Sequence, residues 1–147
     1  MVKGHDTVLK KSGLKTTKGR AAILHILSNE KQPLDVDGIE ERLATQKLSL
    51  DNATVYRILE AFVEHSIATR VEFKEGKFRY ELATLPHHHH AICTNCGSIQ
   101  DIEGCSIDFL ETSVEDRLNF KIVSHTMDFF GLCAKCKITE NALSRDH

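Results

Sequence analysis

The sequence predicts an α+β fold of two small domains, an N-terminal helical domain that ends in a β-hairpin and a smaller C-terminal α/β domain. Three observations predict this fold. Apolar residues recur at helical spacing three times in the first half of the chain, two strand-like segments follow them, and all five cysteines lie in the second half. The 147 residues are 41% hydrophobic and 27% charged, which excludes collagen-like and disordered classes.

Charge divides the chain near Glu81. Residues 1–80 carry 14 Lys and Arg against 11 Asp and Glu, a net charge of +3, whereas residues 81–147 carry 5 against 10, a net charge of −5. The basic half is the candidate for a polyanionic partner, and the acidic half, with six of the nine histidines, is the candidate for metal. We therefore expect one domain over residues 1–83, a hinge at 84–86 and a second domain over 87–147.

The compartment is predicted from what the chain lacks. No apolar run approaches the roughly 18 residues that a membrane span needs, and the first twenty residues contain no hydrophobic signal-peptide core. We therefore expect a cytoplasmic protein without a membrane partner. In a reducing cytoplasm, closely spaced cysteines are metal ligands or redox thiols rather than disulfides.

The elements of the basic half follow in order. The first core helix is expected over residues 17–28, the second after Pro33, and the third after Asp51, which is a good N-cap. Two strands, 68–74 and 77–82, are expected to form a hairpin around Glu75-Gly76. Three helices followed by a two-stranded wing describe a winged helix-turn-helix domain.

In such a domain the last helix enters the major groove of DNA. Its polar face carries Thr54, Tyr56 and Arg57, which are therefore the candidates for base and phosphate contacts. Lys15, Lys18 and Arg20 lie beside the start of the first core helix and can reach phosphates or a minor groove. The alternative is a small helical domain whose cations only solvate its surface.

Two C-x2-C pairs are the most specific motif in the chain. They are Cys93 with Cys96 and Cys133 with Cys136, and 36 residues separate the pairs. Four thiolates form the closed tetrahedral site that structural zinc prefers. The alternative is a set of redox dithiols or inert thiols. The fifth cysteine, Cys105, is interpreted as a small apolar residue that fills space.

A run of four histidines, 87–90, leads directly into the first cysteine pair. If the run is a strand, alternate side chains face opposite sides, so the run can serve two metal sites. One expected site combines Glu81, His88, His90 and Asp101. The other combines His87, His89, Asp108 on a following helix, and His125 on a late strand over 122–130. Mixed nitrogen and oxygen ligands suit exchangeable Fe(II), Mn(II), Co(II) or Zn(II), and a solvated histidine run is the alternative.

The order of these motifs resembles the ferric uptake regulator family of bacterial metal-dependent repressors. The resemblance rests on residues 52–57 (Asn-Ala-Thr-Val-Tyr-Arg), Tyr80-Glu81, the histidine run and the two cysteine pairs, and it covers about residues 8–137. It implies a homodimer that recognises a palindromic operator, with a DNA-binding N-terminal domain and a C-terminal dimerisation domain.

The resemblance also implies roles for the metal ligands. The four paired cysteines match positions that bind structural zinc in the family. Glu81, His88, His90 and Asp101 match ligands of a sensory divalent metal. An additional site is matched by His87, His89, Asp108 and His125. The expected function is therefore repression of metal-homeostasis or peroxide-stress genes, with no enzymatic activity.

The chain departs from the family pattern in one segment. Family members that sense iron, manganese or peroxide usually supply a histidine ahead of the second core helix, but residues 29–34 contain none. His25 and His65 are possible substitutes, or else ordinary surface residues. An aspartate at position 101, in place of glutamate, is similar to the pattern of peroxide-sensing family members. In those proteins bound Fe(II) reacts with peroxide and a ligand histidine is oxidised, and His88 would be that ligand here. Fe(II) or Mn(II) is favoured, a zinc uptake regulator is the alternative, and a zinc-dependent enzyme or a metal buffer is a remote one.

Overall fold

The computed structural model describes residues 3–144, so the first two and last three residues of the expected domains lie outside it. The chain forms two compact units, one that ends at Leu85 and one that begins at Pro86. Within residues 3–144, none of the helices combines the length and apolarity that crossing a membrane requires. The fold class predicted from the sequence, a winged helix-turn-helix followed by a small α/β domain with clustered cysteines, is confirmed.

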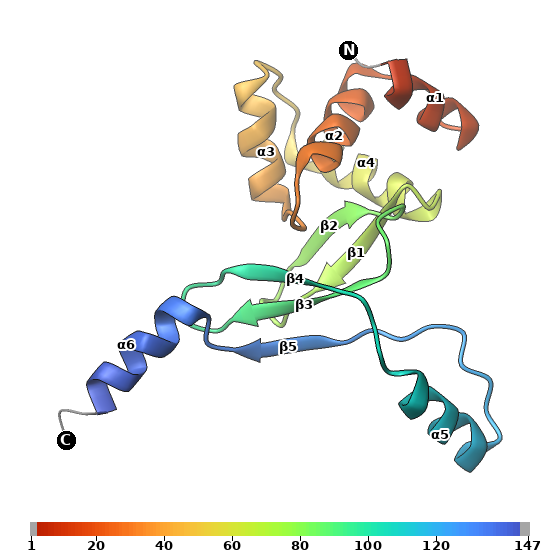
Figure 1. Ribbon diagram of the computed structural model, residues 1–147. Helices are drawn as coiled ribbons and strands as arrows, with labels where there is room; N and C mark the ends of the chain where they lie inside the picture. The colour runs from red at the N-terminus through yellow and green to blue at the C-terminus, as the bar shows by residue number, and fades with distance from the viewer. Residues whose placement is uncertain (1–2, 145–147) are drawn as a thin grey trace. The chain divides into compact units, whose positions relative to one another are not determined.

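Four helices build the N-terminal unit (Figure 1): α1 (Lys3–Lys11), α2 (Lys18–Asn29), α3 (Val36–Thr45) and α4 (Asn52–Glu64). The last three are the predicted helices, and each begins after a capping side chain. Thr17, Asp35 and Asp51 accept hydrogen bonds from the backbone N–H three residues on. Helix α1 was not predicted, because its sequence is largely polar and its fully buried Leu9 lies among charged neighbours.

The core of this unit lies between the apolar faces of α2, α3 and α4. Leu9 of α1 and Tyr80 join it, and the aromatic rings of Phe62 and Tyr80 are among its largest fully buried side chains. Each such side chain stabilises the fold by about 1.5–3 kcal/mol relative to its exposure to water. This core holds α4 in place while its polar side faces solvent.

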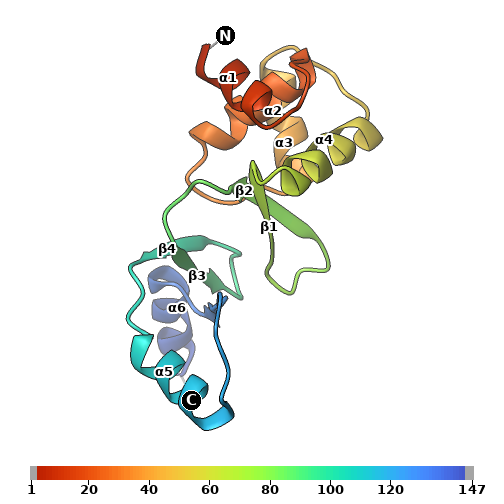
Figure 2. The ribbon, with the colours of Figure 1, turned by 90° about the vertical axis from the view of Figure 1, so that its right-hand side faces the viewer.

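The wing is an antiparallel pair of strands (Figure 2), β1 (Ala68–Glu72) and β2 (Phe78–Leu82), in which Arg70 pairs with Tyr80. Both strands are slightly shorter than predicted, because Lys74 and Gly76 adopt φ values of 60° and 75° in the turn. Leu34 pairs with Tyr80 in a two-way backbone bridge, with N···O distances of 3.0 and 2.8 Å. The loop between α2 and α3 is therefore anchored beside β2.

A three-stranded sheet is the centre of the C-terminal unit (Figure 1). Its strands are β3 (His88–Cys93), β4 (Ile99–Glu103) and β5 (Asp128–Gly131), in the order β4-β3-β5. Strand β3 is antiparallel to β4 and parallel to β5. Helices α5 (Asp108–Leu118) and α6 (Ala134–Ser144) complete the unit, and α6 was not predicted.

The predicted strand over 122–130 is wrong except for its last three residues. Helix α5 ends at Asn119 in the left-handed conformation, with φ 50°. The backbone N–H of Phe120 then donates to the Glu115 carbonyl, and that of Ile122 donates to the Glu115 carboxylate. These bonds keep the segment close to the helix end, so His125 lies on an irregular segment rather than on a strand.

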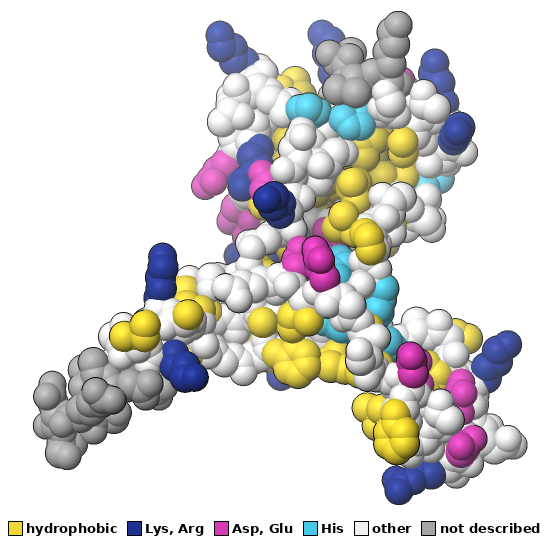
Figure 3. All heavy atoms as spheres, viewed as in Figure 1, with side chains coloured by type: hydrophobic (Ala, Val, Ile, Leu, Met, Phe, Trp, Pro, Cys, Tyr) yellow, Lys and Arg dark blue, Asp and Glu magenta, His cyan; other side chains and the backbone are white. Residues whose placement is uncertain are grey.

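The C-terminal unit leaves much apolar surface exposed (Figure 3). Among residues 86–139, whose burial the structure describes, the buried apolar side chains are Ile92, Cys93 and Ile99, and α5 buries none of its residues. Phe109 is 88% exposed and Val123 is 89% exposed. Monomeric proteins rarely expose apolar side chains on this scale. The unit therefore has a surface suited to a protein partner and little core of its own.

Candidate metal centres and nucleic-acid interface

The four paired cysteines meet at one end of the sheet. Cys93 ends β3, and Gly97, with φ 75°, closes the turn that brings Cys96 back toward it. Cys133 follows β5, the neighbour of β3, and Cys136 lies in the first turn of α6. The four sulfurs lie within 4.8 Å of one another, and those of Cys96 and Cys133 are 3.7 Å apart. A tetrahedral zinc with bonds of about 2.3 Å requires sulfur separations of about 3.8 Å, so the donors fit this ion.

The backbone favours the thiolate at two of these cysteines, Cys93 and Cys133. The pKa of Cys93 is lowered to about 6, first because the N–H of Cys96 donates to its sulfur. The pKa of Cys133 is also lowered, chiefly by the N–H of Cys136 at the start of α6. At Cys136 the hydrogen bond from Asn95 lowers the pKa, but the neighbouring thiols, Cys133 first, outweigh it and raise the pKa to about 11. Since zinc binds the thiolate form, the turn and the helix start favour metal binding at Cys93 and Cys133.

A second cluster lies on one face of β3. It contains His87, His89 and His125, as the sequence analysis expected, but its fourth member is Cys105 instead of Asp108. The Nε2 atom of His125 lies 2.9 Å from Nε2 of His87, 3.3 Å from Nε2 of His89 and 3.3 Å from Sγ of Cys105. Burial, followed by the neighbouring histidines, lowers the pKa of His89, which favours the neutral imidazole that binds metals.

The opposite face of β3 carries His88 and His90, whose ring centroids are 4.8 Å apart. His90 is buried between two carboxylates. Asp101 of β4 lies 3.8 Å from its Nε2, and Asp128 of β5 lies 3.3 Å from its Nδ1. Asp128 carries no signal in the local sequence, since only the parallel register of β5 with β3 places it opposite His90. His88 donates from Nδ1 to the Pro86 carbonyl at 2.7 Å, and this bond fixes the orientation of its ring.

Glu81 belongs to the N-terminal unit, where it is buried on β2 next to Tyr80. The histidine-free loop 29–34 is fastened at the same place, through the bridge between Leu34 and Tyr80. Glu81 therefore directly follows the residue of β2 that is hydrogen-bonded to this loop.

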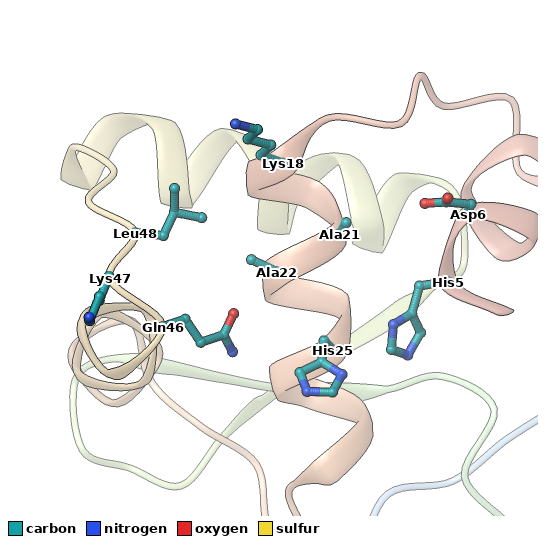
Figure 4. A pocket seen from close by; sticks show the side chains of 9 residues that line it. All are labelled: His5, Asp6, Lys18, Ala21, Ala22, His25, Gln46, Lys47 and Leu48. Carbon is teal, nitrogen blue, oxygen red and sulfur yellow. The ribbon is translucent and has the colours of Figure 1, made fainter. Parts of the chain in front are cut away.

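The two possible substitutes for that histidine have other surroundings. His65 follows α4 and hydrogen-bonds through Nδ1 to the Ala61 carbonyl at 2.8 Å, so it caps the helix end. His25 of α2 lies beside His5 of α1 (Figure 4), with ring centroids 5.4 Å apart. Both rings line a cavity of about 420 Å³ within the N-terminal unit.

Helix α4 presents the predicted polar face. The carboxylate of Asp51 accepts from the N–H of Thr54 at 2.8 Å, and the guanidinium of Arg57 lies 3.4 Å from the Thr54 hydroxyl. Tyr56 is 46% exposed, and Arg57 is also exposed. This exposed, capped helix start is the geometry with which recognition helices contact base edges.

Lys15 and Arg20, two cations near the start of α2, differ in exposure and hydrogen bonding. Lys15 is exposed, whereas the half-buried Arg20 donates to the Lys15 carbonyl at 2.9 Å. Arg20 therefore fixes the loop that carries Lys15. In the wing, Arg70 lies 4.5 Å above the Phe78 ring and 3.1 Å from Glu60 of α4, which ties the wing to the helix.

Comparison with known proteins agrees with this arrangement. The model of the ferric uptake regulator family matches residues 11–130. The ferric uptake regulation protein of Klebsiella pneumoniae is 32% identical over 144 residues, which cover 96% of this chain and 93% of that protein. The Vibrio cholerae ferric uptake regulator is a solved structure with a TM-score of 0.78 and 30% identity, covering 87% of this chain and 98% of that one.

A further solved relative bears on the metal sites. The Helicobacter pylori regulator, described with three functional metal binding sites, has a TM-score of 0.77 and 28% identity, covering 89% of this chain and 87% of that one. The family match spans the whole wing, the histidine run 87–90 and the first cysteine pair. The chain belongs to the ferric uptake regulator family of metal-dependent transcriptional regulators.

Proposed function

We propose that this protein is a cytoplasmic repressor, without catalytic activity, that binds palindromic operator DNA as a homodimer when a regulatory divalent metal is bound. The observation that carries the proposal is the position of β3. This strand presents histidine pairs on both of its faces and begins six residues after the wing of the DNA-binding unit ends. A short linker thus joins the metal ligands to the wing of the DNA-binding unit.

Residues 1–83 are proposed as the DNA-binding domain and 87–147 as the dimerisation domain. The first assignment is supported by the exposed start of α4, with Thr54, Tyr56 and Arg57, and by Lys15 and Arg20 ahead of α2. The second is supported by the exposed apolar side chains of α5 and the segment after it. A dimer would place two copies of α4 on successive turns of the DNA, which suits a palindrome.

The regulatory site is proposed to consist of Glu81, His88, His90 and Asp101. Its C-terminal donors are supported by the geometry of His90 between carboxylates and by the orientation of His88. Two imidazoles with two carboxylates suit Fe(II) or Mn(II), which we favour, and Zn(II) is the alternative ion. Asp128 is proposed to orient His90 through Nδ1.

Control of DNA binding is proposed to arise from linkage. Glu81 lies before the linker and the histidines lie after it, so an ion held by both favours those arrangements of the two domains in which these side chains are close. A coupling free energy of about 1–3 kcal/mol would change operator affinity about 5- to 150-fold. Glu81 would act here without the histidine that loop 29–34 lacks.

The test is fluorescence anisotropy of the dimer on DNA from its own promoter at fixed salt, with Fe(II), Mn(II) or Zn(II) added after mild chelation. We expect one metal to tighten binding at least tenfold and E81Q to abolish that gain while leaving metal-free affinity unchanged. E72Q, a change of an exposed carboxylate in the same wing, is the control that should keep the gain. Equal binding with and without every metal would overturn the proposal, and metal uptake without DNA binding would indicate a metal buffer.

A further inference from the structure

Four donor atoms from separate segments of the C-terminal unit converge on one point. His87 precedes β3, His89 lies within it, Cys105 follows β4, and His125 lies between α5 and β5. One donor atom from each lies within 4.8 Å of the other three. Three nitrogens and a sulfur brought together from such distant positions are a built arrangement, whereas a cysteine that merely fills space would have apolar neighbours.

The separations match those of a four-coordinate metal. With metal–nitrogen bonds of about 2.0 Å and a metal–sulfur bond of about 2.3 Å, a tetrahedron has nitrogen separations of about 3.3 Å and nitrogen–sulfur separations of about 3.5 Å. The observed distances from His125 Nε2 are 2.9 and 3.3 Å to the two other imidazoles and 3.3 Å to the Cys105 sulfur. An ion can therefore replace these direct contacts with only small side-chain movements.

The surrounding groups orient the imidazoles toward that point. Nδ1–H of His125 donates a hydrogen bond to the Glu111 carboxylate at 2.6 Å, so the lone pair of Nε2 faces the cluster. The His89 ring is hydrogen-bonded to the backbone of Met127. A carboxylate or carbonyl behind a histidine is the usual support of a metal-bound imidazole.

We propose that Cys105 is a metal ligand and that His87, His89, Cys105 and His125 form a closed site for a zinc-class ion. This goes beyond the proposed function, because it holds whether or not the site controls DNA binding. Asp108, the oxygen ligand expected at this site, is exposed at the first position of α5 and lies outside the cluster. Its charge has another role there, since an acidic residue favours the start of a helix.

The donor set determines the class of metal. Three neutral imidazoles and one thiolate favour Zn(II) and Co(II), whereas Mn(II) and other hard ions prefer carboxylate oxygens. The four donors fill a tetrahedron, so no position is left open for substrate or water, as in structural zinc sites. On this assignment the two faces of β3 select different metals: the Cys105 face takes zinc, and the His90 face, with its carboxylates, takes a harder ion.

Cobalt spectroscopy of the full-length protein tests the thiolate bond. Protein whose four-cysteine site retains zinc, verified by elemental analysis, is titrated with Co(II) as wild type, C105S and D108N. We expect a thiolate-to-cobalt charge-transfer band that saturates at one equivalent per subunit in wild type and in D108N. C105S should lack the band and should bind zinc at least tenfold more weakly in a chelator competition.

The outcomes separate the alternatives. Loss of tight binding in D108N with an intact C105S would make Asp108 the ligand and overturn the proposal. A band that survives in C105S would come from the four-cysteine site and would also count against it. Circular dichroism and retained zinc show that C105S is folded. Operator affinity is measured in parallel, so failure of DNA regulation with an intact charge-transfer band rejects the proposed function alone.

Discussion

Asp35 illustrates how one side chain links two elements of the DNA-binding unit. Its carboxylate caps α3 by accepting from the Gly38 N–H at 2.8 Å, and it forms an ion pair with Lys77 of the wing turn. Partial burial tends to raise the pKa of Asp35, but the bonds from Lys77 and Gly38 outweigh this effect and leave the pKa below its usual value. The charged form therefore stabilises the folded state.

We predict that D35A lowers the free energy of unfolding by about 1–2 kcal/mol at pH 7, the usual cost of losing an N-cap. Because the folded-state pKa is the lower one, the loss should be present above the unfolded pKa and should vanish as pH falls through the folded pKa. Urea unfolding at several pH values measures it. D37A, a change of an exposed carboxylate in the first turn of α3, is the control, and an equal effect in both variants would contradict the assignment.

Arg57 allows the recognition role of α4 to be tested at one residue. We predict that R57A weakens operator binding about 5- to 150-fold, the equivalent of about 1–3 kcal/mol for a lost base or phosphate contact. Metal content should stay unchanged, because the side chain is exposed and hydrogen-bonds to Thr54 of the same helix, far in sequence from the metal-ligand candidates. Anisotropy titration measures the effect, with the exposed Lys31→Ala as the matched control. Unchanged affinity of R57A would remove Arg57 from the interface.

At the scale of elements, the cysteine cluster joins the ends of β3 and β5 to the start of α6. These elements share few buried apolar side chains, so zinc is expected to supply much of their cohesion. We predict that C96S loses its structural zinc and lowers the melting temperature of the C-terminal unit by well over ten degrees. Elemental analysis and calorimetry measure both effects, and C105S should keep this zinc. A folded, dimeric, zinc-free C96S protein would refute the assignment.

Elements with strong local signals were predictable from the sequence, and those that depend on distant contacts were not. Helices α2 to α4 carry both a cap and an apolar face, and they begin where the sequence indicates. Helix α1 has little apolar periodicity, and β5 is shortened by the bonds of Glu115 to residues beyond α5.

The metal residues divide in the same way. The residue types and spacing of the cysteine pairs and the histidine run are enough to predict metal binding. Cys105 and Asp128, in contrast, reach their clusters only through the path of the chain after β4 and the parallel pairing of β5 with β3. Neither contact leaves a trace in the local sequence, so residue type alone predicts only a space-filling role for Cys105.

At the scale of the whole molecule, assembly is expected to compensate for the small core of the C-terminal unit. Phe109 of α5 and Val123 are almost fully exposed in the single chain. We predict that the double variant F109D/V123D raises the dimer dissociation constant at least thirtyfold, the equivalent of about 2 kcal/mol. Analytical ultracentrifugation measures it. F78D, a change of an exposed aromatic residue in the wing, should remain dimeric. A dimer that survives F109D/V123D unchanged would place the interface elsewhere.

All three metal-ligand clusters depend on the length of strand β3. Its six residues, with His87 just before them, supply ligands to both histidine clusters and end at the first zinc cysteine. Because neighbouring side chains face opposite ways, loss or gain of one residue within the strand would exchange the two histidine sets and displace Cys93 in the same event. A change in the length of this strand would therefore disturb all three ligand clusters at once, whereas substitution of a ligand outside it, such as His125, would alter one cluster alone.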